Sequence, residues 1–394
     1  MSKYLPYITR PILILSIVSL CTDMASEMLY PIMPAFLDSI GFSVLMIGIL
    51  EGFSEMIAGL SKGYFGKRSD VLQKRLPFVQ WGYALSAISK PMMALFAAPL
   101  WIFLARTTDR IGKGLRSAPR DAMLSAMTTP EHKARVFGFH RSMDTLGAVL
   151  GPLLALGILF LYPGNYTLLF LIAFIPGLLA VVSTFRLKEK AGTPRAEKVR
   201  LFSFLDYIKQ APSNYKKLIG GLLVFALINS SDVLLLLHMK ENGVSDHTII
   251  LVYIFYNLVY ALSAFPAGIL ADRIGIRTTL VSGLFLFALV YAGFAVTSQI
   301  WVYWALFGVY GVYAACTEGI AKAWITNISP RSDAGVAVGA YTGLASMAAF
   351  VASASAGAIW KGYGASLTFG ISATVAILAA IYLARIPYKV HTEA

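Results

Sequence analysis

The stretch GILADRIGIR at residues 268–277 joins an apolar segment to a short basic loop. A degraded copy, GKRSDVLQKR, stands at 66–75 after another apolar segment. A second pair follows nearly the same interval, since PEHKARV at 130–136 shares its Pro, Ala and Val positions with PRSDAGV at 330–336. Two matches at corresponding places indicate a duplicated unit, and internal repeats of this kind are common in membrane transporters.

The composition predicts a polytopic membrane protein. Apolar residues make up 57% of the 394 positions. Charged residues make up 13%, against roughly 25% in an average soluble domain. A disordered chain is excluded by the apolar content. A helix needs about 20 apolar residues to cross the hydrocarbon core. Twelve spans are therefore expected, at about 11–38, 44–65, 77–97, 100–126, 134–160, 166–186, 217–239, 245–269, 277–297, 300–327, 333–359 and 364–386.

The net charge of +13 reflects basic residues in alternate short loops, which is the positive-inside pattern of cytoplasmic loops rather than a nucleic-acid footprint. Both termini are expected to be cytoplasmic. The longest loop is basic and divides the chain into an N-terminal six-helix bundle (1–186), a cytoplasmic linker (187–216) and a C-terminal six-helix bundle (217–394). Residues 203–208 are expected to form a short amphipathic helix on the membrane surface.

With these features the chain resembles the major facilitator superfamily of secondary transporters over nearly its whole length. The loop signature of that superfamily, Gly-x3-Asp-Arg-x-Gly-x-Arg, is complete at 268–277. In the copy at 66–75, Val71 and Gln73 replace the first Arg and the second Gly. The resemblance implies an all-α polytopic fold of 12 transmembrane helices in two pseudo-symmetric six-helix bundles.

A third similarity lies in the fifth expected span. Gly147-x3-Gly151-Pro152 is similar to the glycine-rich motif of the proton-driven drug antiporters, although Gly-x3-Gly is also a general helix-packing pattern.

The loop motifs are expected to act as a gate. Asp272 lies at a cytoplasmic helix end with Arg273 and Arg277 around it, so the cluster can tie helices together in one state and release them in another. The alternative is ordinary loop charge that sets topology. The proposed gating residues are Gly66, Asp70, Lys74, Arg75, Gly268, Asp272, Arg273, Arg277, Gly147, Gly151 and Pro152.

Ionisable residues inside spans are costly and indicate function. Asp23 with Glu27 and Glu51 with Glu55 are each four residues apart, so each pair shares one helix face. The full substrate and ion-coupling set is Asp23, Glu27, Glu51, Glu55, Lys90, Arg106, Asp109, Arg110, Asp144, Asp232 and Glu318. The resemblance implies that the first, fourth, seventh and tenth helices line a central cavity, which makes Asp23, Glu27, Arg106, Arg110, Asp232 and Glu318 cavity candidates.

The two halves differ in charge. Arg106 and Arg110 align with Leu306 and Tyr310 in the repeat. This difference predicts that the first half couples protons, while the second half supplies an aromatic wall that includes Tyr253, Tyr256, Tyr260, Tyr310 and Tyr313. The alternative is that the charges are structural ion pairs, with Lys90 neutralising one of the four acids of the first two helices.

No enzyme motif, phosphate loop or zinc spacing is present in the sequence, so neither a catalytic residue nor a cofactor nor a metal site is expected. The leading hypothesis is proton-coupled efflux of a small organic molecule by alternating access. The alternatives are import of an organic anion held by Arg106 and Arg110, export of a divalent metal ion, lipid flipping, and a non-transporting receptor. The expected partners are the small molecule, protons and the bilayer of a bacterial inner membrane, with the protein as a monomer.

Overall fold

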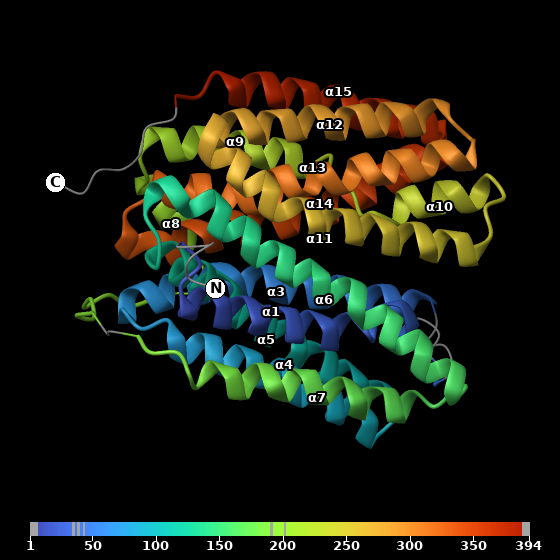
Figure 1. Cartoon of the computed structure of the whole chain (residues 1–394), viewed down its shortest axis with the longest axis horizontal. Helices are drawn as coiled ribbons and strands as arrows, with labels where there is room; N and C mark the ends of the chain where they lie inside the picture. Colours follow the sequence, from blue (N-terminus) through green and yellow to red (C-terminus); the bar gives the residue numbers. More distant parts are fainter. Residues whose placement is uncertain are drawn as a thin grey trace. The chain divides into compact units, whose positions relative to one another are not determined.

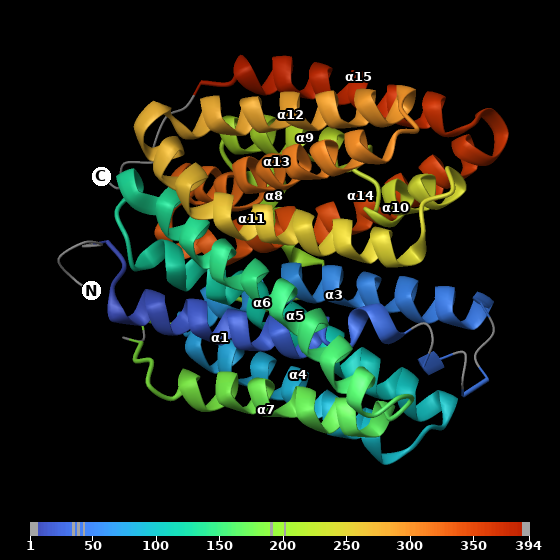
Figure 2. The same ribbon diagram turned by 45° about the vertical axis from the view of Figure 1, so that its right-hand side comes forward.

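The computed structural model describes residues 7–33, 36–37, 40–41, 44–189, 192–200 and 202–387, without the side chains of 31, 44–49, 51–52, 55, 203 and 246–247. Every regular element in these ranges is a helix, and they contain no strand (Figures 1 and 2). The chain forms two compact units. Unit 1 comprises 1–128, 143–209 and 331–343, and unit 2 comprises 129–142, 210–330 and 344–394.

Unit 1 is built mainly from α1 (Arg10–Glu27), α3 (Val44–Leu72), α4 (Leu76–Leu95), α5 (Pro99–Ala126) and α7 (Tyr166–Thr184). Proline in the first turn starts α1, α4 and α5, where the missing N–H costs nothing. The Asn165 side chain caps α7 by accepting the Leu168 N–H at 3.0 Å. In both views α4 runs beside α7 (Figures 1 and 2).

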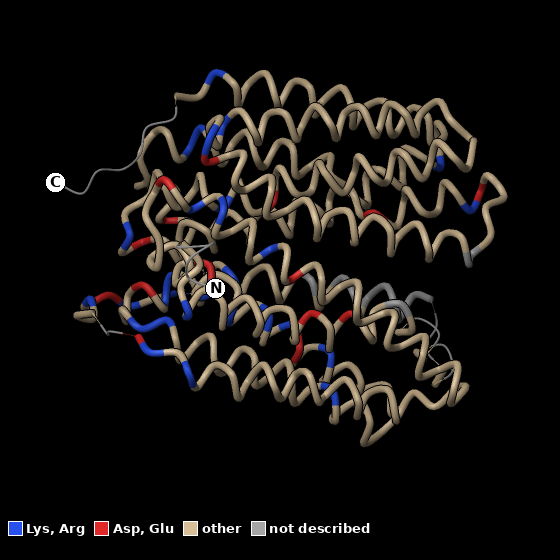
Figure 3. The backbone as a smooth tube through the Cα atoms, viewed as in Figure 1, with Lys and Arg blue, Asp and Glu red and all other residues tan. Residues whose placement is uncertain are grey.

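Unit 2 contains α9 (Ser213–Ala226), α10 (Val233–Glu241), α11 (Asp246–Ile274), α12 (Ile276–Val296), α13 (Ile300–Asn327) and α15 (Ala365–Ala384). The chain turns from α11 into α12 at Gly275, whose φ of 104° suits glycine. Figure 3 shows that these helices carry few charges between their ends, whereas several charged residues lie along the helices of unit 1.

Two helices are shared between the units. The first part of α6 (Lys133–Leu161), up to Ser142, belongs to unit 2, and the remainder belongs to unit 1. The first part of α14 (Ala334–Tyr363), up to Gly343, belongs to unit 1, and the remainder belongs to unit 2. The linker also belongs to unit 1 as far as Lys209. The compact units therefore differ from simple N-terminal and C-terminal halves.

Two expected spans are interrupted. Segment 217–239 forms α9 and α10, which are separated by residues 227–232. The break contains Asn229, Ser230, Ser231 and Asp232, and such side chains compete for backbone hydrogen bonds. In the first span α1 ends at Glu27, and a 3-10 turn follows at Tyr30–Ile32. The expectation of one continuous helix was therefore wrong for both segments.

The helices occupy all twelve expected spans, and the predicted all-α fold is confirmed. Among the described residues, seven helices are long and apolar enough to cross a membrane by length and composition. The charges along α5 and the shortness of α9 and α10 keep these helices out of that group. The predicted amphipathic helix is also confirmed as α8 (Ser203–Gln210), whose buried Phe204 packs against Val336 and Ala340.

Candidate functional site

The break between α9 and α10 places an acidic side chain inside an expected span. The Asp232 carboxylate accepts a hydrogen bond from the Tyr310 hydroxyl of α13 at 2.7 Å. The neighbouring Ser231 N–H donates to the Ser353 hydroxyl of α14 at 3.0 Å. Among the described residues, no ion pair joins Asp232 to a basic side chain. A proton or a bound cation would therefore neutralise this carboxylate.

Aromatic rings surround the same position. The Tyr310 ring lies 5.1 Å from the Tyr256 ring and 5.1 Å from the Tyr313 ring, measured between centroids. Phe287 and Tyr291 lie farther along this cluster, each 6.4 Å from Tyr310. The structure thus brings the predicted aromatic residues together with Asp232, and the cluster continues through Tyr256 to Tyr253 and Tyr260.

Glu318 has a different environment. It forms an ion pair with Arg141 of α6, and the Arg141 Nε donates to the Tyr260 hydroxyl at 2.5 Å. The Arg141 guanidinium also lies 5.3 Å from the centre of the Tyr260 ring. The negative charge of Glu318 is therefore matched within unit 2.

The mid-span charges of unit 1 form a buried pair. The Lys90 ammonium of α4 lies 2.8 Å from the Asp109 carboxylate of α5, and both side chains are almost fully buried. Lys90 also donates to the Ser26 hydroxyl of α1 at 3.3 Å. The expectation that Lys90 neutralises an acid of the first two helices was wrong, because Asp109 takes that place.

A second network lies nearer the expected cytoplasmic end. Arg120 donates to Asp121 at 2.9 Å and to the Ser19 hydroxyl of α1 at 3.1 Å. Ser19 in turn donates to the Asp144 carboxylate of α6. Arg116 donates to Ser86 of α4 at 2.5 Å. These bonds join α1, α4, α5 and α6 within unit 1.

The remaining candidates are distributed over unit 1. Asp23 and Glu27 are partly buried on α1, whereas the side chains of Glu51 and Glu55 lie outside the described residues. Arg106 and Arg110 are buried on α5, where both interact with the charge of Asp109.

The Gly147 and Gly151 motif places α6 in close contact with α1. A Cβ at Gly147 would meet the Leu20 carbonyl oxygen, and one at Gly151 would lie 2.7 Å from the Met24 carbonyl oxygen. Pro152 is buried directly after this contact. The geometry is that of helix packing, the more general of the two interpretations of this motif.

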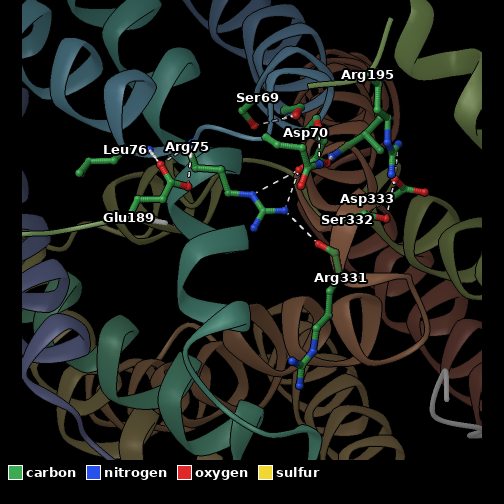
Figure 4. Close-up of polar contacts among 12 residues, drawn as sticks. Ser69, Asp70, Arg75, Leu76, Glu189, Arg195, Arg331, Ser332 and Asp333 are labelled. Carbon is green, nitrogen blue, oxygen red and sulfur yellow. Dashed lines mark hydrogen bonds and ion pairs between the residues drawn. The ribbon is translucent and has the colours of Figure 1, made fainter. Parts of the chain in front are cut away.

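The degraded motif in unit 1 binds the start of α14 (Figure 4). Asp70 accepts the Arg75 guanidinium at 2.9 Å and the Val336 N–H at 2.7 Å. Arg75 also donates to the Arg331 carbonyl oxygen at 2.9 Å. Asp70 lies beyond the expected span 44–65, and burial raises the pKa of its carboxyl to about 6 against the opposing effect of Arg75.

The intact motif in unit 2 has a matching arrangement at the start of α6. Asp272 accepts the Arg135 side chain at 2.5 Å and the Arg135 N–H at 3.2 Å. The expectation that Arg273 and Arg277 surround Asp272 was wrong, because Arg273 is exposed and Arg277 donates to the Ile386 carbonyl oxygen at 3.2 Å. Arg135 is remote in sequence from this motif, so the loop pattern alone does not reveal it.

The motif glycines allow these close approaches. A Cβ at Gly66 would meet the Gly335 carbonyl oxygen, and one at Gly268 would lie 2.5 Å from the Ala134 carbonyl oxygen. Lys74, in contrast, is exposed.

The linker makes contacts that the sequence does not predict (Figure 4). The Glu189 carboxylate accepts the N–H groups of Arg75 and Leu76, at 2.8 and 2.7 Å, where α4 begins. Arg195 forms a 2.8 Å ion pair with Asp333, just before α14. The linker is therefore attached to the same group of helix ends as Asp70.

Comparisons with known proteins agree with this architecture. The model of the Major Facilitator Superfamily matches residues 15–237 and 218–393. An uncharacterized MFS-type transporter of Methanocaldococcus jannaschii is 31% identical over 382 residues, covering 95% of this chain and 94% of that protein. The multidrug resistance protein MdtH of Cronobacter sakazakii is 29% identical over 119 residues, covering 30% of this chain and 29% of MdtH.

Solved structures show the same fold. The human organic anion transporter MFSD10 superposes with a TM-score of 0.81 at 17% identity, over 95% of this chain and 99% of that one.

Proposed function

Because the chain belongs to the Major Facilitator Superfamily, we propose that this secondary transporter exports a small organic molecule in exchange for protons. The observation that supports this proposal is Asp232, an acid in an interrupted span that accepts a hydrogen bond from the Tyr310 hydroxyl. Interrupted helices in transporters commonly form substrate and ion sites. An acid without a basic partner among the described residues can exchange a proton during the cycle.

Alternating access needs helix contacts that exist in one state and break in the other. Asp70 holds the start of α14, and Asp272 holds the start of α6, each through a backbone N–H and an arginine. We assign these two clusters as cytoplasmic latches. The partial similarity to MdtH supports the outward direction of transport. A bacterial inner membrane with both chain termini in the cytoplasm fits the basic loops.

The test uses everted membrane vesicles with an imposed inside-acid proton gradient and a fluorescent pH reporter. Cationic, neutral and anionic compounds and divalent metal ions are added in turn. We expect one class to collapse the gradient in the native protein and in Glu241→Gln, an exposed acid at the end of α10. Asp232→Asn should abolish the response. Normal responses in Asp232→Asn would contradict the coupling role of this residue.

The same assay compares the coupling acids predicted in the two halves. Loss of the response in Asp23→Asn and Glu55→Gln, with Asp232→Asn unaffected, would return proton coupling to the first half.

Import of an organic anion is the second candidate, because Arg106 and Arg110 are buried in the span of α5. An anion that enters cells together with protons, and fails to enter when both arginines are replaced by glutamine, would favour it over export.

A further inference from the structure

We infer that the break between α9 and α10 binds a monovalent organic cation with an apolar body, and that this cation replaces the proton on Asp232. The inference rests on the proposed function and adds the substrate class. It concerns unit 2 alone, since Asp232, its hydrogen-bond donor and the surrounding rings all lie there.

The charges around the break favour a cation. Two acids, Asp232 and Glu318, are close enough to repel each other, and Arg141 pairs with Glu318. One negative charge therefore remains at Asp232 when its carboxyl is ionised. The titratable groups that interact with Asp232 from the neighbouring helices are Tyr256 on α11, Tyr291 on α12, and Tyr310 and Glu318 on α13. None of these supplies a positive charge, and Arg141 is already paired with Glu318, so an anionic ligand would be repelled by the Asp232 carboxylate.

The aromatic residues favour an organic cation over a metal ion. Tyr310 donates to Asp232, and its ring lies 5.1 Å from the rings of both Tyr256 and Tyr313. Aromatic faces attract organic cations and also bury an apolar body. A calcium or transition-metal site needs several hard or soft ligands. The described residues contain no group of three or more His, Cys, Asp and Glu side chains that could hold a metal ion.

The exchange is a simple acid–base step. The neutral Asp232 carboxyl loses its proton to water, and the carboxylate that remains pairs with the arriving cation. No bond other than the O–H bond breaks, and no electron is transferred. At a pH at which the free protein holds the proton on Asp232, binding should therefore release about one proton for each monovalent cation bound, and at higher pH fewer.

The test measures binding to the purified full chain in detergent by equilibrium dialysis. The probes are tetraphenylphosphonium and tetraphenylborate, which share a shape and carry opposite charges. We expect tetraphenylphosphonium to bind, to bind more weakly as the pH falls, and to release protons in weakly buffered solution. Tetraphenylborate, measured in a separate dialysis because the two ions precipitate each other, should not bind. Preferential binding of tetraphenylborate, or no binding of the cation at any pH, would overturn the inference.

Variants locate the site. Asp232→Asn should weaken tetraphenylphosphonium binding about tenfold or more and remove its pH dependence, since the charge pair is lost. Glu241→Gln should bind as the native protein does. Tyr256→Leu keeps the carboxylate and removes one ring, so it should weaken binding of the cation and leave the release of a proton on binding unchanged. Unchanged binding in folded Asp232→Asn would refute the assignment.

The two proposals fail separately. If the cation binds at Asp232 but no compound collapses the proton gradient in vesicles, the cation site stands and proton-coupled export falls. If a neutral or anionic compound collapses the gradient while tetraphenylphosphonium does not bind, export stands and the cation assignment falls.

Discussion

At the scale of single residues, Lys90 and Asp109 decide whether the buried charges of unit 1 are structural or functional. Both side chains are almost fully buried, and their charged atoms lie 2.8 Å apart. Removing one partner of a buried pair leaves an uncompensated charge, at a cost of about 3–5 kcal/mol. Replacing both partners by apolar residues of similar size is often neutral or stabilising.

Because Arg106 and Arg110 also interact with the charge of Asp109, we expect Asp109→Leu to lower the thermal stability of the purified protein strongly, and Lys90→Met/Asp109→Leu to restore part of it. A structural pair also predicts that the double variant transports like the native protein. Both quantities are measurable, by thermal unfolding in detergent and by gradient collapse in vesicles. A stable double variant without transport would show that these charges take part in the cycle.

Sequence reasoning identified these charges but not their partners. Composition and hydropathy placed Lys90, Asp109 and Asp232 inside spans, because a charged residue within an apolar run can be recognised from the amino-acid sequence. The pairing of Lys90 with Asp109 depends on how α4 faces α5. Likewise, the donation from Tyr310 to Asp232 crosses between helices far apart in sequence. Such choices follow from tertiary packing, which periodicity within one helix does not encode.

At the scale of elements, the linker acts as a cap on α4. The first N–H groups of a helix have no partner within the helix, and a carboxylate there also interacts favourably with the helix dipole. Glu189 supplies this carboxylate from beyond α7 by accepting the N–H groups of Arg75 and Leu76. The Arg195 N–H then donates to the Val71 carbonyl oxygen at 2.8 Å, so the linker follows the end of α3.

Glu189→Ala should expose the Arg75 and Leu76 amides and weaken the local structure by about 1–2 kcal/mol. Hydrogen–deuterium exchange should show faster exchange at the peptide that contains residues 75–76. Lys188→Ala, which changes the exposed neighbour, is the matched control. Equal exchange in both variants would mean that the carboxylate does not hold the start of α4.

The helices themselves were predictable, because long apolar runs fix their number and approximate position. The breaks were harder to predict. The run Asn229, Ser230, Ser231 and Asp232 is the signal that could have revealed the interruption in 217–239, since four polar residues capable of local hydrogen bonds follow one another inside an apolar segment. The Leu and Val residues on either side keep the average hydropathy of 217–239 high, so the average does not reveal this polar run.

At the scale of the whole molecule, the two helices that begin in one compact unit and continue in the other occupy equivalent positions in the sequence repeat. The start of α6 and the start of α14 occupy equivalent positions in the duplicated sequence. The start of α6 belongs to unit 2, which contains most of the second half of the chain, and the start of α14 belongs to unit 1, which contains most of the first half. Each start is held by the aspartate of a repeated loop motif. The repeat made two equivalent loop clusters predictable. It did not predict that each binds a helix from the other half, because sequence similarity carries no information on partner choice.

If these helix ends are latches, fixing one covalently should stop transport. The Cβ positions of Ala118 on α5 and Gly339 on α14 lie 3.2 Å apart, near the separation of about 3.5–4.5 Å in a disulfide. A Cβ at Gly339 also lies 2.5 Å from the Lys62 carbonyl oxygen, so Gly339→Ala measures the effect of the added side chain alone. In a chain whose Cys21 and Cys316 are replaced by alanine, we expect Ala118→Cys/Gly339→Cys to lose on oxidation the transport that it retains, like Gly339→Ala, when reduced. A reductant should restore transport.

The control pair is Ala87→Cys/Gly177→Cys, whose Cβ positions lie 3.3 Å apart between α4 and α7. Both helices belong to unit 1 along their whole length, so this disulfide should leave transport unchanged. Gel mobility after labelling of free thiols measures how completely each pair is oxidised. Full oxidation of the α5–α14 pair with undiminished transport would show that α14 keeps its place throughout the cycle. The gate would then have to open by motions that leave the Asp70 cluster closed.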